Sequence, residues 1–192
     1  MRSFRRLSGL IFLCLGVITA EADEAPGTLR LKYLGAAGWE LQSNGLVVLF
    51  DPYISRIKYD GEGQKDDPRK DFALTDAPES DVKLIDKIIT KADFILVHHT
   101  HPDHAMDVPY IARKTGPKVI GTETTKNLLR AAGVPEQQLY AVQGGEDYQF
   151  ERFSVRVIPS LHSPLNEKRY FSSSRHGADF KGPLRLEHFI EG

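Results

Sequence analysis

The first hydrophobic pattern along the chain predicts an antiparallel β-meander. Between residues 28 and 34, leucine and tyrosine side chains alternate with basic ones, which is the period of a half-buried strand with its apolar side turned inward. The pair Asn44-Gly45 then separates the runs 39–42 and 46–50, and Asn-Gly between two such runs predicts a tight hairpin. Three antiparallel strands are therefore expected at the start of the fold.

From residue 80 onward the pattern changes to alternating helices and strands. Apolar side chains share one helical face over residues 82–89, after a cap at Ser80 or Asp81, and the apolar run over 92–97 predicts a buried strand. Further elements are expected as a helix over 105–115, a strand over 118–120, a helix from a Thr122 cap to Gly133, and strands over 153–157 and 184–190. The order of these elements predicts a mixed α/β fold.

Residues 56–78 follow neither pattern. Their composition turns to lysine, aspartate, glycine and glutamate without a period, which predicts a solvated loop. Two interpretations stay open for this loop. It is either a surface excursion, which is the favoured reading, or a flap over a functional site.

The first 22 residues have the pattern of an export signal. Three arginines precede the apolar stretch 10–20, and small residues fit a signal-peptidase cleavage after Ala22. A membrane anchor is the alternative, but about eleven apolar residues fall short of the roughly 20 that a spanning helix needs. We therefore expect a signal peptide at 1–22, one domain at 23–192, export to the periplasm or the medium, and no stable membrane anchor after cleavage.

Charge and cysteine content narrow the set of partners. The net charge of the chain is −1 and no basic cluster is present, which argues against nucleic acid as a partner. The single cysteine, Cys14, lies inside the expected signal, so the mature domain has neither a disulfide nor a thiolate ligand for a metal. Such an exported domain depends on its hydrophobic core, on a metal, or on both.

The candidate chemistry is concentrated directly after the buried strand at 92–97. His99, His101, Asp103 and His104 fall within one short run, in a chain with seven histidines in total. Imidazole nitrogen and carboxylate oxygen are ligands that divalent ions such as zinc prefer, and iron or manganese accept them as well. The run therefore predicts a metal site.

Two further histidines are interpreted from their position. In an extended chain the side chain of His98 points opposite to that of His99, towards the interior of the sheet, so His98 is expected to be structural or to support a ligand. His162 follows the strand expected over 153–157. That position alone leaves open whether His162 binds the metal or has a structural role.

The arrangement H-x-H-x-D-H after a hydrophobic strand, with a distant histidine after a later strand, resembles the metallo-β-lactamase superfamily. The runs Leu34-Gly35 and 49–53 are similar to the opening of its lactonase-like hydrolases. The resemblance implies an αββα sandwich, of which this chain would supply the N-terminal αβ half plus part of the second. Asp51 matches a position close to the site in that group, where it would support a ligand instead of binding metal.

The same resemblance implies the ligands and the reaction. His99, His101 and His162 would bind a first ion, and Asp103 and His104 would bind a second. A metal-bound hydroxide would attack an ester, lactone or phosphodiester-type substrate, while Asp103 orients the water and moves its proton. The expected function is that of an exported metal-dependent hydrolase acting on a small molecule, and the alternative is a catalytically inactive metal-binding fragment of such an enzyme.

Two features depart from the family pattern. Many relatives have a histidine where Ala36 stands, so their substrate contacts are not carried over. After His162 nothing matches the family's bridging aspartate and final histidine, and Asp179, His176 and His188 are the less favoured substitutes. We therefore expect the front part of a longer hydrolase, which binds about one metal ion at its three histidines. One face of its sheet is expected to be open to water, so that the product is unstable, aggregates or dimerises.

Overall fold

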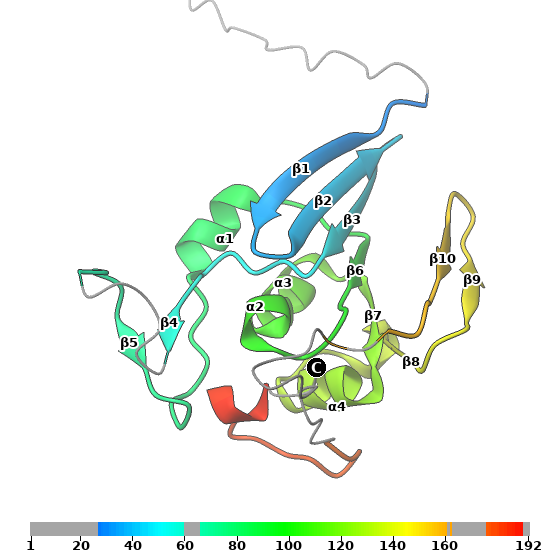
Figure 1. Ribbon diagram of the computed structural model, residues 1–192. Coiled ribbons are helices and arrows are strands. Elements are labelled where there is room, and N and C mark those ends of the chain that lie inside the picture. The colour runs from blue at the N-terminus through cyan, green and yellow to red at the C-terminus, as the bar shows by residue number, and fades with distance from the viewer. Residues whose placement is uncertain (1–26, 60–65, 161, 163–175, 190–192) are drawn as a thin grey trace, which may run out of the picture.

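The computed structural model describes residues 27–59, 66–160, 162 and 176–189. Its central element is a six-stranded sheet in the order β1-β2-β3-β6-β7-β8 (Figure 1). These strands are β1 (Arg30–Gly35), β2 (Gly38–Ser43), β3 (Leu46–Phe50), β6 (Phe94–Leu96), β7 (Lys118–Thr122) and β8 (Leu139–Val142). Two small sheets pair β4 (Lys58–Tyr59) with β5 (Asp71–Phe72) and β9 (Asp147–Gln149) with β10 (Ser154–Arg156).

The first three strands form the antiparallel meander that the sequence predicts. Asn44 and Gly45 join β2 to β3 with backbone φ angles of 48° and 74°, and positive angles at both residues are what a tight two-residue hairpin requires. β3, β6, β7 and β8 then run parallel to one another. The sheet therefore begins as a meander and continues as helix-connected crossovers.

Short helices connect the parallel strands. They are α1 (Val82–Ile88), α2 (Pro102–Ala105), α3 (Val108–Thr115) and α4 (Glu123–Ala131), with 3-10 turns η1 (Glu136–Gln138) and η3 (Leu186–His188). The expected caps are present, because the Asp81 side chain accepts a hydrogen bond from Leu84 N at 2.9 Å and the Thr122 hydroxyl accepts one from Thr125 N at 3.2 Å. Within the described residues, no helix has the length and apolar character needed to cross a membrane.

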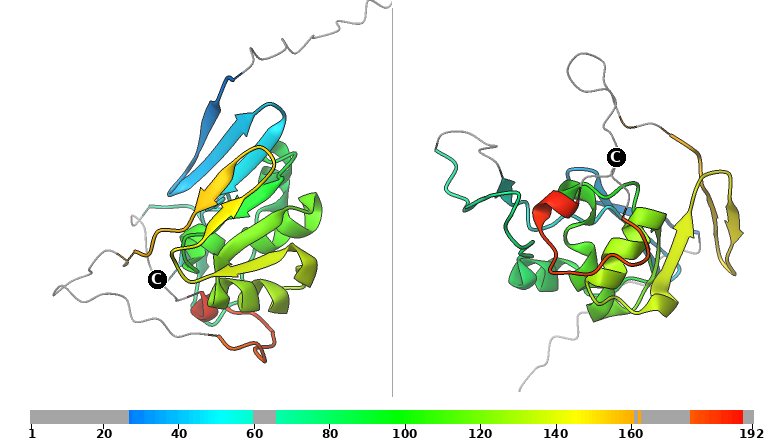
Figure 2. Two further views of the ribbon diagram at one scale, coloured as in Figure 1. Left: turned by 90° about the vertical axis from the view of Figure 1, so that its right-hand side faces the viewer. Right: turned by 90° about the horizontal axis from the view of Figure 1, so that it is seen from below.

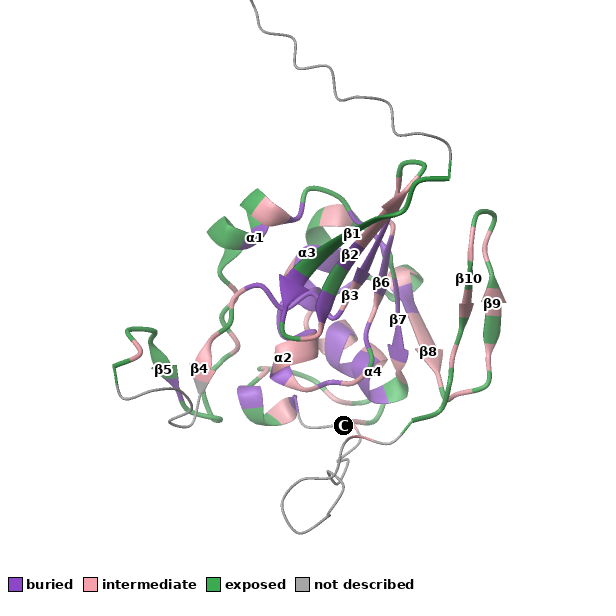
Figure 3. Ribbon diagram, turned by 45° about the horizontal axis from the view of Figure 1, so that its top comes forward, coloured by how far each residue is buried: buried purple, intermediate pink, exposed green. Residues whose placement is uncertain are grey.

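One face of the central sheet packs against helices and forms the main core. Leu49, Ile95 and Val119 lie on this face, and Ile111 of α3 and Leu128 of α4 join them in the same cluster. All five side chains are at most 1% exposed, and Figure 3 shows the buried band along the central strands. Because successive strand residues alternate between faces, this packing fixes the register of the strands and the position of their ends.

The β9–β10 hairpin covers part of the opposite face, over β6. Phe94 of β6 lies beneath Phe150 and Phe153 of the hairpin, with ring centroids 4.6 and 4.7 Å apart. In Figure 2 the hairpin stands on the side of the sheet away from α3 and α4. Helices, a central sheet and a separate hairpin confirm the predicted mixed α/β class.

The burial of β1 differs from the prediction. Leu29, Leu31 and Tyr33 were expected to face inward, but they are 56%, 57% and 60% exposed, because no described segment packs over them on the hairpin side. Trp39 of β2 is 41% exposed and its ring lies 5.0 Å from that of Tyr33. These four residues form an apolar strip at the edge of the sheet, named here the β1 strip.

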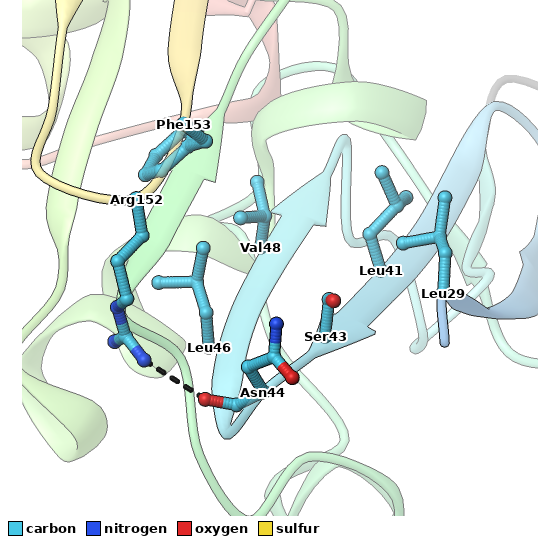
Figure 4. A pocket seen from close by; sticks show the side chains of 8 residues that line it. All are labelled: Leu29, Leu41, Ser43, Asn44, Leu46, Val48, Arg152 and Phe153. Carbon is cyan, nitrogen blue, oxygen red and sulfur yellow. Dashed lines mark hydrogen bonds between the residues drawn. The ribbon is translucent and has the colours of Figure 1, made fainter. Parts of the chain in front are cut away.

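A groove lies between the β1 strip and the hairpin (Figure 4). It has a volume of about 350 Å³ and is lined by Leu41 and Val48 from the sheet and by Phe153 from the hairpin, among others. Arg152 donates a hydrogen bond to Asn44 O at 2.8 Å across one end of it. The groove and the β1 strip together present an apolar surface of the kind that favours contact with another apolar surface.

Two predicted elements have a different form in the structure. The helix expected over 105–115 is divided into α2 and α3, because Pro109 has no N–H with which to continue the helical hydrogen bonds. The strand expected over 184–190 is wrong. The described part of that range contains η3, and Leu186 N donates to Asp76 O at 2.9 Å in place of a strand partner.

The segment 56–78 is more ordered than the expected loop. Outside residues 60–65, which are not described, it contains the β4–β5 pair, and Phe72 is buried in the main core. The interpretation of this segment as a flap over a site stays a prediction.

We expect the β1 strip to mediate association between two copies of this chain. Leu31→Gln combined with Tyr33→Gln removes apolar side chains from the strip, so this variant should show a smaller associated fraction than the wild type in size-exclusion chromatography with light scattering. Val82→Gln with Leu84→Gln, two partly exposed positions on α1, is the matched control and should behave as the wild type. Elution of the wild type as a monomer at every concentration contradicts the prediction.

Candidate metal centre

Three histidines from two distant segments meet at the carboxyl end of the sheet. His99 and His101 follow β6, and His162 follows β10 after the chain has turned back from the hairpin (Figure 1). One ring nitrogen or the other from each histidine lies within 4.8 Å of those of its two neighbours. The three residues are partly buried, so the group is sheltered without being closed to solvent.

The three rings surround a common point. Their centroids are separated by 4.5 Å for His99 and His101, by 5.0 Å for His99 and His162, and by 4.9 Å for His101 and His162. The ring planes meet at 83°, 89° and 60°, so the rings do not stack flat on one another. Three imidazole nitrogens gathered in this way are a donor set that zinc accepts.

The surroundings of His99 suit a neutral imidazole ligand. Burial, followed by the neighbouring imidazoles of His104, His101 and His162, lowers the pKa of His99 to about 3. Its Nε2 atom is buried and makes no hydrogen bond to any described residue. A buried polar nitrogen without a partner costs free energy, and a bound cation would remove that cost. The donor set therefore fits a divalent metal ion.

The backbone after β6 directs the first two side chains. Val97 N donates to Ile120 O at 2.9 Å, and the chain leaves the sheet after this bond. Pro102 then begins α2, with His101 as its N-cap residue. His99 and His101 are two positions apart on the intervening segment, and their ring centroids lie 4.5 Å apart.

A buried carboxylate supports the histidine run. Asp51 follows β3 and is fully buried, with a φ of 39°. Its Oδ1 accepts a hydrogen bond from His98 N at 2.9 Å, and its Oδ2 lies 2.5 Å from His98 Nδ1 and 2.9 Å from His104 Nδ1. Burial acts to raise the pKa of Asp51, but the contacts with His104 and His98 together lower it below its usual value. Asp51 thus remains charged and orients His104.

Asp103 and His104 lie beside the three-histidine group, on α2. The ring of His104 is 3.9 Å from that of His99, measured between centroids. Because His104 Nδ1 faces Asp51, its Nε2 is the nitrogen that lies 3.6 Å from Asp103 Oδ2. The Asp103 side chain is 43% exposed. The pair offers two ligands to a second ion, and among the described residues no third ligand lies within reach of the pair.

The sequence analysis predicted that the side chain of His98 points into the interior of the sheet, and this prediction is wrong. It is 64% exposed and stacks on Phe50 with ring centroids 6.1 Å apart, because β6 ends at Leu96 and the alternation of a strand stops there. Its role as a supporting residue agrees with its contact to Asp51. The hydrogen bond that the His98 ring makes to the Asp51 carboxylate raises the pKa of His98 above its usual value.

The C-terminal histidines form a separate cluster. His176 Nε2 lies 2.8 Å from His188 O, and both rings pack on Phe180. Asn127 of α4 donates a hydrogen bond to His176 O at 2.7 Å. Within the described residues, His176, His188 and the exposed Asp179 do not belong to the three-histidine group.

Asp107 is a buried charged residue that the sequence pattern does not reveal. It is fully buried, and it accepts hydrogen bonds from Ile54 N and Ser55 N, both at 2.7 Å, and from Ser55 Oγ at 2.6 Å. Its place shortly after His104, at the end of the metal motif, is the only signal in the sequence that points to it. Ordinary composition rules predict an exposed aspartate there.

Comparison with known proteins identifies the family. The profile of the beta-lactamase superfamily domain matches residues 30–178. The chain belongs to the β-lactamase superfamily. The matched region contains all six strands of the central sheet, the histidine run and His162, and it confirms the resemblance seen in the sequence.

Curated members of this superfamily that match the chain are named metal-dependent hydrolases. One from Carboxydothermus hydrogenoformans is 30% identical over 134 residues, which cover 70% of this chain and 48% of that protein. One from Thermodesulfovibrio yellowstonii is 29% identical over 165 residues, covering 82% and 54%. The chain therefore spans about half the length of the curated relatives it matches. A solved metallo hydrolase from Ignicoccus hospitalis matches with 20% identity and a TM-score of 0.49, over 74% of this chain and 52% of that one.

We expect His99→Ala to weaken zinc binding more than about 100-fold, because loss of a direct ligand exceeds the 10–100-fold effect of a supporting residue. Zinc affinity is measured by competition with a chromophoric chelator, together with the metal content of the reconstituted protein. His188→Ala is the control, since His188 lies in the separate C-terminal cluster, and it should bind zinc as the wild type does. Equal zinc affinity in His99→Ala and the wild type contradicts the assignment.

Proposed function

We propose that this chain is the metal-binding part of a metal-dependent hydrolase. The observation that carries the proposal is the convergence of His99, His101 and His162, whose ring nitrogens lie within 4.8 Å of one another although they come from two separate segments. Membership of the superfamily supports the same activity, as do the names of the curated relatives.

Zinc is the proposed ion, and iron or manganese are the alternatives, because imidazole and carboxylate donors suit all three. When bound, the ion would supply a Lewis acid that polarises a substrate oxygen and lowers the pKa of a water molecule. The three imidazoles are neutral donors, so they leave the charge of the ion available to an electron-rich substrate. His104 and Asp103 provide a second, weaker position with two ligands.

Asp103 is the proposed residue for proton transfer. Its carboxylate is partly exposed beside His104 Nε2, 3.6 Å away. From this position the carboxylate can hold a water molecule, orient it and accept its proton. Asp51 limits the movement of His104 through the contact at Nδ1, so the partner of Asp103 is held in place.

The proposed substrates are small molecules with an ester, lactone or phosphodiester bond. Hydrolysis of each bond places negative charge on an oxygen, which a cation and fixed donors stabilise. The similarity of residues 34–53 to the opening of lactonase-like enzymes favours these substrates over β-lactams.

We also propose that the protein is exported. The support is the sequence of residues 1–22, which lie outside the described part of the chain and combine a basic start, an apolar centre and small residues before the cleavage point. N-terminal sequencing of the protein recovered from the periplasm or the medium should give Asp23 as the first residue. Recovery of the whole chain with an intact N-terminus contradicts export with cleavage.

Hydrolysis assays on the zinc-loaded chain from Asp23 onward test the main proposal. The protein is expected to hydrolyse a generic phosphodiester or a simple lactone and to lose this activity in the presence of a chelator. His101→Ala removes a ligand and should abolish turnover, and Asp103→Asn should reduce the rate about 100-fold or more. His188→Ala is the control and should retain the wild-type rate.

The assay separates two functions. Turnover that requires both zinc and His101 supports the hydrolase. Zinc binding without turnover of either substrate supports the alternative, an inactive metal-binding fragment. Equal rates in the wild type and in His101→Ala contradict a hydrolase built on this site.

A further inference from the structure

Asp107 holds one end of the loop that carries Asp51. Its Oδ2 accepts hydrogen bonds from Ile54 N and Ser55 N, both at 2.7 Å, and its Oδ1 accepts one from Ser55 Oγ at 2.6 Å. Three donors on one buried carboxyl group fix both the position and the direction of this backbone, because these hydrogen bonds are short and hydrogen bonds are directional.

Asp51 and Asp107 join the same two segments, the loop 51–55 and the segment that contains the histidine run. Asp51 lies on the loop 51–55 and binds the histidine run, through His98 N and the ring of His104. Asp107 follows the histidine run and binds the loop. The loop and the run are therefore joined at two points, each by a buried carboxylate. We name this pair the carboxylate clamp.

A third contact extends the carboxylate clamp to α1. Ser55 Oγ donates to Asp107 and accepts a hydrogen bond from Asp81 N at 2.7 Å, and Asp81 is the cap of α1. Ser80 is a further hydrogen-bond partner of Asp107. The clamp thus connects the loop after β3, the turn before α3 and the start of α1.

We propose that Asp107 is a positioning residue of the metal centre. It fixes the loop 51–55 and thereby the Asp51 carboxylate, which orients His104 and the backbone that enters the histidine run. The inference rests on the proposed function, because it requires a metal to bind at the three histidines.

Loss of the carboxylate clamp should weaken metal binding without removing a ligand. In Asp107→Ala the N–H groups of Ile54 and Ser55 lose their acceptor, and the loop is free to move into the space of the carboxylate. Supporting residues change metal affinity about 10–100-fold, so zinc binding about 10-fold weaker than in the wild type is expected. Asp107→Asn keeps an oxygen acceptor at the same place and should retain most of the affinity.

The experiment compares zinc affinity and stability in the same samples. Affinity is measured by competition with a chromophoric chelator, and stability is measured by urea unfolding of the metal-free protein. Leu128→Ala, in the buried face of α4, is the matched control. It should lower stability through lost packing and leave zinc affinity unchanged, so a loss of affinity in Asp107→Ala alone is not explained by a weaker fold.

A double-mutant cycle tests the route through the loop. Asp51→Asn and Asp107→Ala act through the same loop, so their effects on zinc affinity should not add. The double variant should bind zinc about as weakly as the single variant that has the lower zinc affinity. If the losses of zinc affinity in the two single variants add fully in the double variant, Asp107 does not act through Asp51 and the loop. Folded Asp107→Ala that binds zinc as the wild type does overturns the inference and leaves Asp107 as an anchor of the fold.

Ser55→Ala keeps the test decisive if Asp107→Ala does not fold. This change removes the two hydroxyl contacts, to Asp107 and to Asp81 N, and keeps the backbone contacts to Asp107. A several-fold loss of zinc affinity supports the inference, and unchanged affinity overturns it. A wild-type protein that binds no zinc contradicts the proposed function, and the inference falls with it. A zinc-binding wild type with unchanged Asp107→Ala and Ser55→Ala contradicts the inference alone.

Discussion

The buried charge of Asp51 is the constraint on which the candidate site depends. A carboxylate without solvent must take hydrogen-bond donors from the protein. Asp51 accepts one from His98 N, and its Oδ2 lies against the Nδ1 atoms of His98 and His104, inside the run that carries the candidate ligands. β3 and β6 are parallel neighbours, and Asp51 follows β3 while the histidine run follows β6. The contacts of the Asp51 carboxylate with the histidine run therefore fix these two segments relative to each other. The orientation of the His104 ring depends on its contact with Asp51 as well as on its position in the histidine run.

The sheet brings the parts of the site together at one edge. Parallel strands present their carboxyl ends side by side, which is where open α/β sheets place their ligands. Asp51 follows β3 and His99 follows β6, while Asp107 lies after α2 at the same end of the molecule. Interior packing, centred on residues such as Ile95 and Val119, keeps these strand ends in register. Core packing and site geometry are therefore parts of one arrangement.

The local part of the site could be predicted from the sequence, and the distant part only through the resemblance. His99 and His101 follow a continuous apolar run, which locates a strand end directly. The path that returns His162 to them depends on how a hairpin packs, and no local pattern encodes that path. Asp107 was missed because a burial pattern cannot show which aspartate finds donors on another loop.

The fold shows the same division between local and long-range information. The Asn44-Gly45 hairpin and the Asp81 and Thr122 caps were predicted because each depends on a few neighbouring residues. β1 was predicted as a strand, but its apolar side was wrongly placed in the interior, since alternation reveals two faces and not what covers them. β8 was not predicted, because no polar residue interrupts the run Leu139–Val142 to give the alternation of a strand.

Docking of the β9–β10 hairpin on the sheet and the position of His162 are thermodynamically linked. Phe150 and Phe153 hold it on Phe94, and the chain that leaves it carries His162 to the other histidines. A cation at the site would favour the docked hairpin by mass action, and undocking would in turn remove one nitrogen from the cation. The aromatic contacts of the hairpin would thus be coupled to the affinity for the cation, and part of the binding energy would be used to keep the hairpin docked on the sheet.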